Sequence, residues 1–214
     1  MEALVSVVMP VRNGGDWLDA AVGSILAQDH ASLELIIVDD HSDDGALDRL
    51  DKSDRRLKFM ASAGHGVSAA FNTGMAAARG RFIARMDADD IALPCRLRVQ
   101  LEYLEQNPGL ALCGGVVELF SEQGLAGGNL RYQAWLNDCR TPRAIARELF
   151  IESPIPNPSA FFRREALLEL QGYADPDWPE DYDLFLRADA RGMQIAPGGS
   201  QRLGQRRPWR EDQL

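Results

Sequence analysis

Short apolar runs and longer amphipathic segments alternate along the first half of the chain. The apolar runs predict strands at residues 4–9, 33–38, 57–60 and 81–86. Apolar residues at helical spacing, with Asp16 as a plausible N-cap of the first segment, predict helices at residues 17–26, 46–53 and 67–78. This alternation is typical of a mostly parallel sheet covered by helices.

The second half of the chain has a more mixed pattern. Pro94 stands at the start of a predicted helix over 95–106, and Thr141 and Pro142 predict the N-terminus of another helix over 141–149. The remaining segments predict a strand at 110–119, a turn or hairpin at 121–132, an extended segment at 157–163, and helices at 165–170 and 180–191. No internal repeat or long linker interrupts this pattern, so we expect a single domain.

Composition narrows the class of protein. The chain has 214 residues, 45% of them hydrophobic and 26% charged, as expected for a globular domain with a core of its own. Its net charge of −9 argues against a nucleic-acid partner. Three cysteines without metal-ligand spacing, no visible signal peptide and no long apolar run predict a cytoplasmic protein.

Carboxylates gather where two of the predicted strands end. Asp87, Asp89 and Asp90 directly follow the strand at 81–86, and Asp39 and Asp40 follow the strand at 33–38. In open α/β sheets, ligands bind outside the carboxyl ends of the strands. Oxygen ligands of this kind suit a hard divalent cation such as Mg²⁺, which is usually shared with substrate phosphates. A solvated acidic turn is the alternative interpretation of either segment alone.

Four motifs in a fixed order carry a resemblance to a known family. They read VSVVMPVRNGGDWLDAAVGSILAQ, LELIIVDDHSDDG, GVSAAFNTGMAAARGRFIARMDADDIALPCRL and WPEDYDLFLRA. Over Leu4 to Arg191 the chain resembles the family 2 glycosyltransferases, which are inverting, metal-dependent enzymes of the GT-A type. The resemblance implies an α/β, GT-A-like nucleotide-binding fold, with a mostly parallel central sheet flanked by helices and a smaller mixed region.

The resemblance also implies a division of the chain. A single GT-A-like domain would span 1–192, with a nucleotide-binding half at about 1–107 and an acceptor half at about 108–192. Residues 193–214 depart from the family pattern and form a basic tail that contains glycine and proline. Arginines in this tail can contact anionic lipid at the inner face of a membrane, and a solvated tail is the alternative interpretation.

Candidate site residues follow from the matched motifs. The family's Asp-x-Asp motif implies Asp89 and Asp87 as ligands of Mg²⁺ or Mn²⁺, and the Glu-Asp motif implies Asp181, beside Glu180, as the general base. A pKa raised by apolar neighbours would make Asp181 a better base. The positions that match the family's nucleotide-binding segments are Pro10, Val11, Asn13, Asp39, Asn72, Asp87 and Ala88.

The expected activity is transfer of a sugar from a nucleotide-diphosphate sugar, UDP- or dTDP-linked, to a glycan or lipid-linked saccharide in polysaccharide biosynthesis. An alternative is a protein that binds a nucleotide-sugar without turnover, because the C-terminal region is atypical. A nucleotidyltransferase is a third reading. It would be expected to carry a glycine-rich, basic phosphate loop after the first strand, which the segment at 10–15 does not match.

Overall fold

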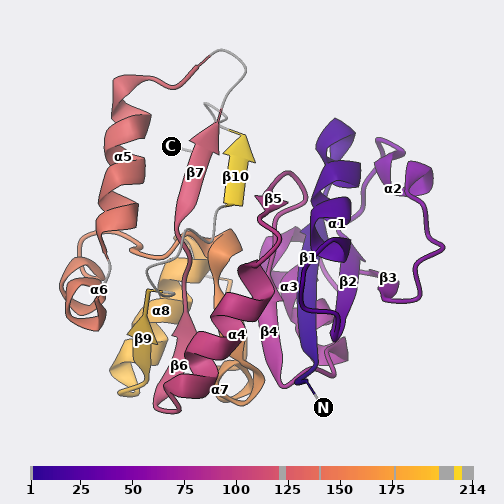
Figure 1. Ribbon diagram of the computed structural model, residues 1–214. Coiled ribbons are helices and arrows are strands. Elements are labelled where there is room, and N and C mark those ends of the chain that lie inside the picture. Colours follow the sequence, from indigo (N-terminus) through magenta and orange to yellow (C-terminus); the bar gives the residue numbers. More distant parts are fainter. Residues whose placement is uncertain (1, 121–123, 140, 176, 198–204, 209–214) are drawn as a thin grey trace.

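The computed structural model describes residues 2–120, 124–139, 141–175, 177–197 and 205–208. In this part of the chain a seven-stranded sheet has the order β3-β2-β1-β4-β8-β6-β9, and a separate three-stranded sheet has the order β5-β10-β7 (Figure 1). The strands are β1 (Val5–Val11), β2 (Leu33–Asp39), β3 (Leu57–Ala61), β4 (Phe82–Arg85), β5 (Ile91–Ala92), β6 (Leu110–Cys113), β7 (Val117–Phe120), β8 (Phe161–Arg163), β9 (Gln194–Ala196) and β10 (Gln205–Pro208).

Helices connect most of these strands. The α-helices are α1 (Leu18–Leu26), α2 (Ala46–Arg49), α3 (Gly66–Ala77), α4 (Arg96–Gln106), α5 (Gly127–Asp138), α6 (Pro142–Glu148), α7 (Arg164–Glu169) and α8 (Glu180–Ala190). Two short 3-10 helices are η1 (Gly15–Trp17) and η2 (Asn157–Ser159). The expected α/β fold with a mostly parallel sheet is confirmed.

Parallel pairing in the first half brings the expected strand ends together. β1 pairs in parallel with both β2 and β4, and β2 pairs in parallel with β3. In the register of β1 and β2, Val11 lies opposite Asp39, and Asp39 in turn lies opposite Ala61 of β3. The polar segments that follow β1, β2 and β4 therefore meet at one edge of the sheet, which is where α/β proteins bind ligands.

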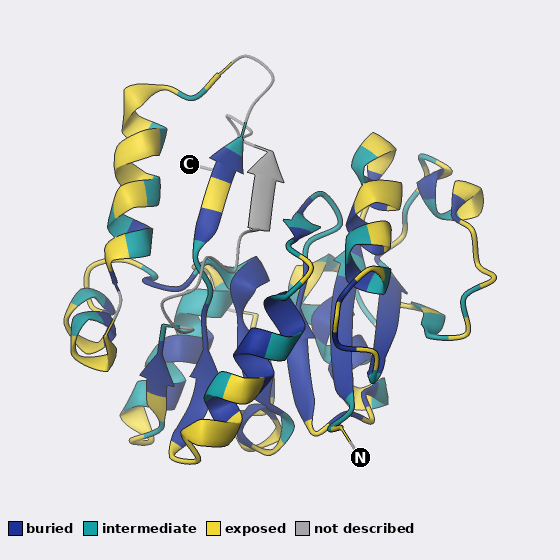
Figure 2. Ribbon diagram, in the orientation of Figure 1, coloured by how far each residue is buried: buried dark blue, intermediate teal, exposed yellow. Residues whose placement is uncertain are grey.

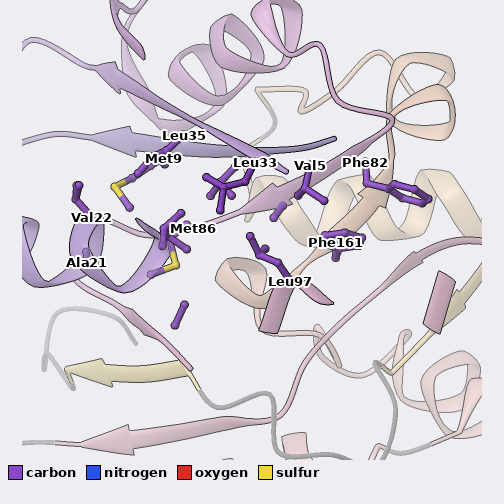
Figure 3. Close-up of a cluster of buried hydrophobic side chains, with 14 of the residues drawn as sticks. Val5, Met9, Ala21, Val22, Leu33, Leu35, Phe82, Met86, Leu97 and Phe161 are labelled. Atoms are coloured by element: carbon purple, nitrogen blue, oxygen red, sulfur yellow. The ribbon is translucent and has the colours of Figure 1, made fainter. Parts of the chain in front are cut away.

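Helices cover both faces of the sheet, and each face has its own apolar core. On one face, Val5, Val7 and Met9 of β1 pack with side chains of α1 and α4 (Figure 3). On the other face, Val8 packs with residues of α3, α7 and α8. This alternation along β1 is the period-2 pattern of a strand buried on both sides, and Figure 2 shows the central strands as almost continuously buried.

Helix α3 approaches the sheet unusually closely at Gly74. A Cβ atom at this position would lie 2.5 Å from Cγ1 of Val8 and 3.0 Å from Cγ2 of Val38. Only a residue without a side chain allows this contact, and it holds α3 directly against β1 and β2.

A buried carboxylate ties the sheet together near the amino end of β1. Glu34 accepts hydrogen bonds from the Ser6 hydroxyl at 2.6 Å and the Lys58 ammonium at 2.7 Å, and from Arg79 through its backbone N–H at 2.8 Å. Burial raises the pKa of Glu34, but these hydrogen bonds outweigh it and lower the pKa to about 2. One side chain thus joins β1, β2, β3 and the turn before β4.

The structure corrects several expectations for local structure. Residues 127–138 form helix α5 where a turn or hairpin was expected over 121–132, and residues 121–123 lie outside the described part. The strand expected at 110–119 is divided into β6 and β7, with Gly114 and Gly115 between them. Asp16 lies within η1 and Trp17 occupies the N-cap position of α1, so the capping role expected for Asp16 is wrong.

The region expected to be a tail contains regular structure. β9 pairs in parallel with β6 and completes the seven-stranded sheet, and β10 pairs with both β5 and β7. The tail sequence has too little periodicity to indicate these strands, because their pairing depends on partners far away in the chain. No helix in the described ranges combines the length and apolar character needed to cross a membrane.

Replacing Glu34 by Gln should weaken the fold. The amide cannot form charge-assisted hydrogen bonds with Lys58 and Arg79, so we expect a loss of about 2 kcal/mol in the free energy of unfolding at pH 7. The folded-state pKa of Glu34 is lowered, so its ionisation stabilises the fold above pH 4.5, and this contribution is lost as the pH falls toward about 2.

Urea denaturation from pH 7 to pH 2.5 measures this difference. Glu105→Gln, at an exposed position of α4, is the matched control and should leave stability nearly unchanged. An equal effect of both substitutions would show that the Glu34 network contributes nothing beyond general surface charge.

Candidate functional site

A pocket of about 460 Å³ lies at the carboxyl end of β4. Its lining includes Arg85 and the three aspartates after β4, together with the segment from Pro179 to Asp181. Apolar side chains of β7 and α5, including Leu119 and Leu136, complete the lining. The structure therefore brings two acidic motifs, about 90 residues apart in sequence, into one pocket.

Arg85 compensates part of the negative charge in this pocket. Its side chain is 4% exposed, and its guanidinium forms an ion pair with the carboxylate of Asp87. Asp87 and Asp89 are half-buried, while Asp90 is fully buried. The short strand β4 ends at Arg85, so the chain turns directly from the sheet into these carboxylates.

Asp90 faces the interior of the domain. Burial lowers the pKa of the neighbouring Arg96 to about 10, and the charge of Asp90 counteracts part of that shift. Arg96 is 1% exposed and donates to the carbonyl oxygen of Arg85 at 2.7 Å and to the side chain of Gln100 at 3.1 Å. Arg96 thus supports the wall of the pocket from behind.

The first turn of α8 places Glu180 and Asp181 at the pocket. Glu180 accepts a hydrogen bond from the amide of Asn157 at 3.0 Å. The oxygen of that same amide accepts a hydrogen bond from the hydroxyl of Tyr173. Burial raises the pKa of this tyrosine, which keeps its hydroxyl protonated as a donor. This chain of hydrogen bonds fixes Glu180 at the start of the helix.

Asp181 has the properties of a proton acceptor. Burial raises its pKa to about 6, and the adjacent charge of Glu180 acts in the same direction. The backbone N–H of Tyr182 and the charge of Arg85 counteract part of the shift. The pKa of Asp181 is therefore raised, as a general base would require, while the nearby side chain of Trp178 is 56% exposed. A carboxylate with this pKa is ionised near neutral pH and still basic enough to accept a proton.

A second polar group lies at the ends of β1 and β2. The backbone N–H of Asn13 donates to the hydroxyl of Ser42 at 3.1 Å, and the backbone N–H of Ser42 donates to the carboxylate of Asp39 at 2.9 Å. The side-chain oxygen of Asn13 accepts from the backbone N–H of Asp43 at 2.9 Å. These bonds hold the loops after β1 and β2 together around Asp39.

The remaining predicted nucleotide-binding residues occupy different places. Pro10 and Val11 form the last positions of β1 beside Asp39, and Ala88 lies between the two aspartates of the Asp-x-Asp motif. The side-chain amide of Asn72 binds the backbone of Tyr173: it donates to the carbonyl oxygen at 2.8 Å and accepts from the N–H at 2.9 Å. In this structure Asn72 fixes α3 to the segment after α7.

The sequence pattern of glycosyl transferase family 2 matches residues 6–171, which is most of the chain. The chain belongs to this family. The match includes the segments that follow β1, β2 and β4, and it ends before the Glu-Asp motif of α8.

Relatives in the family include two proteins from Escherichia coli. The O-antigen biosynthesis glycosyltransferase WbnJ is 30% identical over 188 residues, which cover 86% of this chain and 71% of that protein. UDP-Glc:alpha-D-GlcNAc-diphosphoundecaprenol beta-1,3-glucosyltransferase WfgD is 32% identical over 143 residues, which cover 64% of this chain and 56% of that protein. The family 2 chain described here thus spans between about half and three quarters of the length of these relatives.

A solved structure supports the fold. The mannosyltransferase PcManGT from Pyrobaculum calidifontis, in complex with GDP-Man and Mn²⁺, superposes with a TM-score of 0.74 at 19% identity. The superposition covers all of this chain and 59% of that one. The GT-A-like architecture implied by the sequence motifs is confirmed.

Two residues of this family 2 site were not among the predicted site residues. Arg85 is a charged residue within an otherwise apolar strand, and that unusual position was the available signal. Tyr173 gave no such signal, because its role depends on contacts with Asn157 and Asn72 that form only in the folded chain.

Removing the charge of Arg85 should lower the free energy of unfolding and raise the pKa of Asp181. Arg85→Gln leaves Asp87 half-buried without its cation, so we expect a loss of about 2–4 kcal/mol in the free energy of unfolding. Because Arg85 lowers the pKa of Asp181, the substitution should also raise that pKa further above 6. Urea denaturation and a carboxyl ¹³C NMR titration measure the two effects.

Arg85→Lys, which retains the positive charge, is the control for this substitution. It should preserve most of the effect on the pKa of Asp181. If the glutamine variant titrated like the wild type, Arg85 would have no electrostatic influence on the pocket.

Proposed function

We propose that this protein is an inverting glycosyltransferase that moves a sugar from a nucleotide-diphosphate sugar to the hydroxyl group of a saccharide acceptor. The observation that carries the proposal is the pocket that is lined both by the carboxylates after β4 and by Asp181, whose pKa is raised to about 6. One side can hold the leaving group, and the other can accept the proton of the attacking hydroxyl.

The reaction requires one displacement. Asp181 takes the proton of the acceptor hydroxyl. At the same time, the oxygen of that hydroxyl forms a bond to the anomeric carbon of the donor. The bond from that carbon to the diphosphate breaks, and the leaving diphosphate retains the electron pair. Attack opposite the leaving group inverts the anomeric configuration. Glu180, held by Asn157, keeps the first turn of α8 in place and raises the pKa of Asp181 through its charge.

The donor set after β4 fits a divalent cation. Asp87 and Asp89 offer only oxygen ligands, which is the chemistry that Mg²⁺ and Mn²⁺ prefer. One carboxylate oxygen of Asp87 is engaged by Arg85, so Asp89 is our first choice as a direct ligand and Asp87 our second. A bound ion would supply positive charge that stabilises the leaving diphosphate. Mn²⁺ appears with the donor in the mannosyltransferase structure.

The polar loops after β1 and β2 are the proposed nucleotide-binding surface. Asp39 can accept the imide N–H of uracil or thymine, and Pro10, Val11 and Asn13 lie beside it at the same edge of the sheet. A UDP- or dTDP-linked donor is therefore our preference. The name of the relative WfgD also includes a UDP-linked sugar, UDP-Glc.

A lipid-linked saccharide is the proposed acceptor. Part of the pocket lining consists of apolar side chains of β7 and α5, which suit the faces of a sugar ring better than a charged group. The names of WbnJ and WfgD refer to O-antigen biosynthesis and to a diphosphoundecaprenol-linked sugar. This assignment divides the chain near residue 107 into a donor half and an acceptor half.

Asp181→Asn should abolish transfer while it stabilises the fold. Without the proton acceptor, we expect kcat to fall by about 10²–10⁴-fold, with nucleotide affinity nearly unchanged. Because the folded-state pKa of Asp181 is raised, its ionisation costs stability as the pH rises from 3.8 through about 6. Replacement by Asn removes this cost, so the variant should gain about 1–3 kcal/mol at pH 8.

Release of nucleoside diphosphate with a panel of lipid-linked acceptors measures transfer, and urea denaturation measures stability. In the wild type, kcat/KM should fall as the pH drops below about 6. Asp189→Asn, at the other end of α8, is the matched control and should retain activity. If nucleotide binding were lost together with transfer, Asp181 would not act as the base. If the wild type bound the donor but never turned it over, the binding-only alternative would hold.

Asp89→Asn should weaken nucleotide binding through the metal. We expect the affinity for UDP or dTDP in saturating Mn²⁺ to fall by about tenfold or more, with little change in the absence of the ion. Isothermal titration with and without Mn²⁺ separates these cases. Unchanged affinity in Mn²⁺ would contradict the ligand assignment, and the stability of the variant is checked in parallel by its thermal midpoint.

A further inference from the structure

A cluster of one carboxylate and two imidazoles lies at the ends of β2 and β3, outside the pocket of the proposed reaction. It consists of Asp40 and His41, directly after β2, and His65, directly before α3. One potential ligand atom from each side chain lies within 4.8 Å of the others. Residues 24 positions apart in the sequence thus converge on one point.

Asp40 is held rigidly at this point. Its side chain is buried, and both carboxylate oxygens accept the backbone N–H of Gly66, at 3.1 and 3.0 Å. Its own N–H donates to the carbonyl oxygen of Val11 at 2.8 Å. The carboxylate is therefore fixed before any ligand arrives, and each oxygen has a second lone pair for a further contact.

The two imidazoles are exposed and lie face to face. Their ring centroids are 4.2 Å apart, with an angle of 23° between the planes. His41 has a φ of 58°, in the left-handed region, where a residue with a side chain is uncommon. This backbone conformation directs the chain after β2 toward the loop that carries His65.

We propose that Asp40, His41 and His65 form a binding site for a divalent transition-metal ion of the zinc class. Imidazole nitrogen with carboxylate oxygen is a donor set that suits Zn²⁺, Co²⁺ and Ni²⁺, whereas the all-oxygen set after β4 suits Mg²⁺ and Mn²⁺. Three protein ligands leave the fourth tetrahedral position for water. Rotation of the exposed imidazoles would bring the ligand atoms to the roughly 3–3.5 Å separation found around tetrahedral zinc.

An ion at this site would add a further connection between two loops that are already joined by the Asp40–Gly66 hydrogen bonds and by the stacked rings of His41 and His65. His41 lies two residues from Asp39, so the connection would stiffen the edge of the proposed base-binding surface. Binding of the ion itself requires no nucleotide and does not depend on the proposed transfer reaction. A test of ion binding can therefore fail while the test of transfer activity succeeds, and the reverse also holds.

The composition of the chain permits a clean test. The sequence contains three histidines, and the third, His30, is buried with its ring nitrogen bonded to the carbonyl oxygen of Ala3. Cys113 and Cys139 are buried, and only Cys95 is partly accessible among the three thiols. Variants of His41, His65 and Cys95 thus cover the accessible nitrogen and sulfur ligands.

The experiment is a Zn²⁺ titration of the full chain, without a histidine tag, in competition with a chromophoric chelator. We expect one ion per chain, with affinity reduced at least about tenfold in His41→Asn and in His65→Asn and abolished in the double variant. Co²⁺ should give the intense visible absorption of a four-coordinate site. Cys95→Ser and Asp89→Asn should bind as the wild type does, and circular dichroism checks that each variant is folded.

Three results would overturn the proposal. The first is that the wild type does not bind Zn²⁺, and the second is that the double histidine variant binds it unchanged. The third is that Asp89→Asn loses Zn²⁺ binding, which would assign the ion to the carboxylates after β4. Asp40→Asn adds a further check, because its amide oxygen can still accept from Gly66. It should weaken Zn²⁺ binding without unfolding the helix start, and equal affinity in this variant would remove Asp40 from the ligand set.

Discussion

The ion pair between Arg85 and Asp87 is the interaction on which the acidic pocket depends. Several carboxylates converge where β4 ends, and the protein as a whole carries a net charge of −9. Without a buried cation, their mutual repulsion would oppose folding at this edge of the sheet. A single guanidinium, held in place because its backbone belongs to a central strand, places a positive charge beside these carboxylates. The same guanidinium keeps the pKa of Asp181 from rising further.

Arg85 belongs to β4, the strand through which the second half of the chain is joined to the first. β8 pairs with β4 and with β6, so the second half is built onto the strand that carries Arg85. Asn157, in the 3-10 helix just before β8, holds Glu180 at the pocket. Strand pairing and the hydrogen bond between Asn157 and Glu180 therefore link the carboxylates after β4 to the first turn of α8. Such rigid support is what a displacement reaction with a separate base and leaving-group site requires.

The sequence predicted those parts of the protein that depend on local pattern. The strands of the first half, the Asp-x-Asp segment and the Glu-Asp segment at the start of α8 all lie where periodicity and motif placed them. Helix α5 was missed because its first residues, Gly127 and Gly128, favour a turn and its amphipathic pattern is weak. Asn72 matched a motif, yet its amide is used by the backbone of Tyr173, 101 residues away. Contacts of that kind, like the pairing of β9 with β6, arise from the tertiary arrangement and leave no local signal.

Glu34 and Asp181 show how the surroundings of a carboxylate can either stabilise or destabilise its charged form. Glu34 accepts hydrogen bonds from β1, β3 and the turn before β4, and these lower its pKa to about 2. Its charge therefore stabilises the fold fully above pH 4.5, and this contribution is lost as the pH falls toward about 2. Asp181 is half-buried, and the partial burial of its carboxyl, together with the charge of the adjacent Glu180, raises its pKa to about 6. The fold gains nothing from ionising Asp181 and loses stability when it does so near neutral pH. A carboxyl group with a raised pKa thus lowers the free energy of unfolding near neutral pH. Groups with perturbed pKa values are concentrated in functional pockets, where a side chain that can accept a proton is needed.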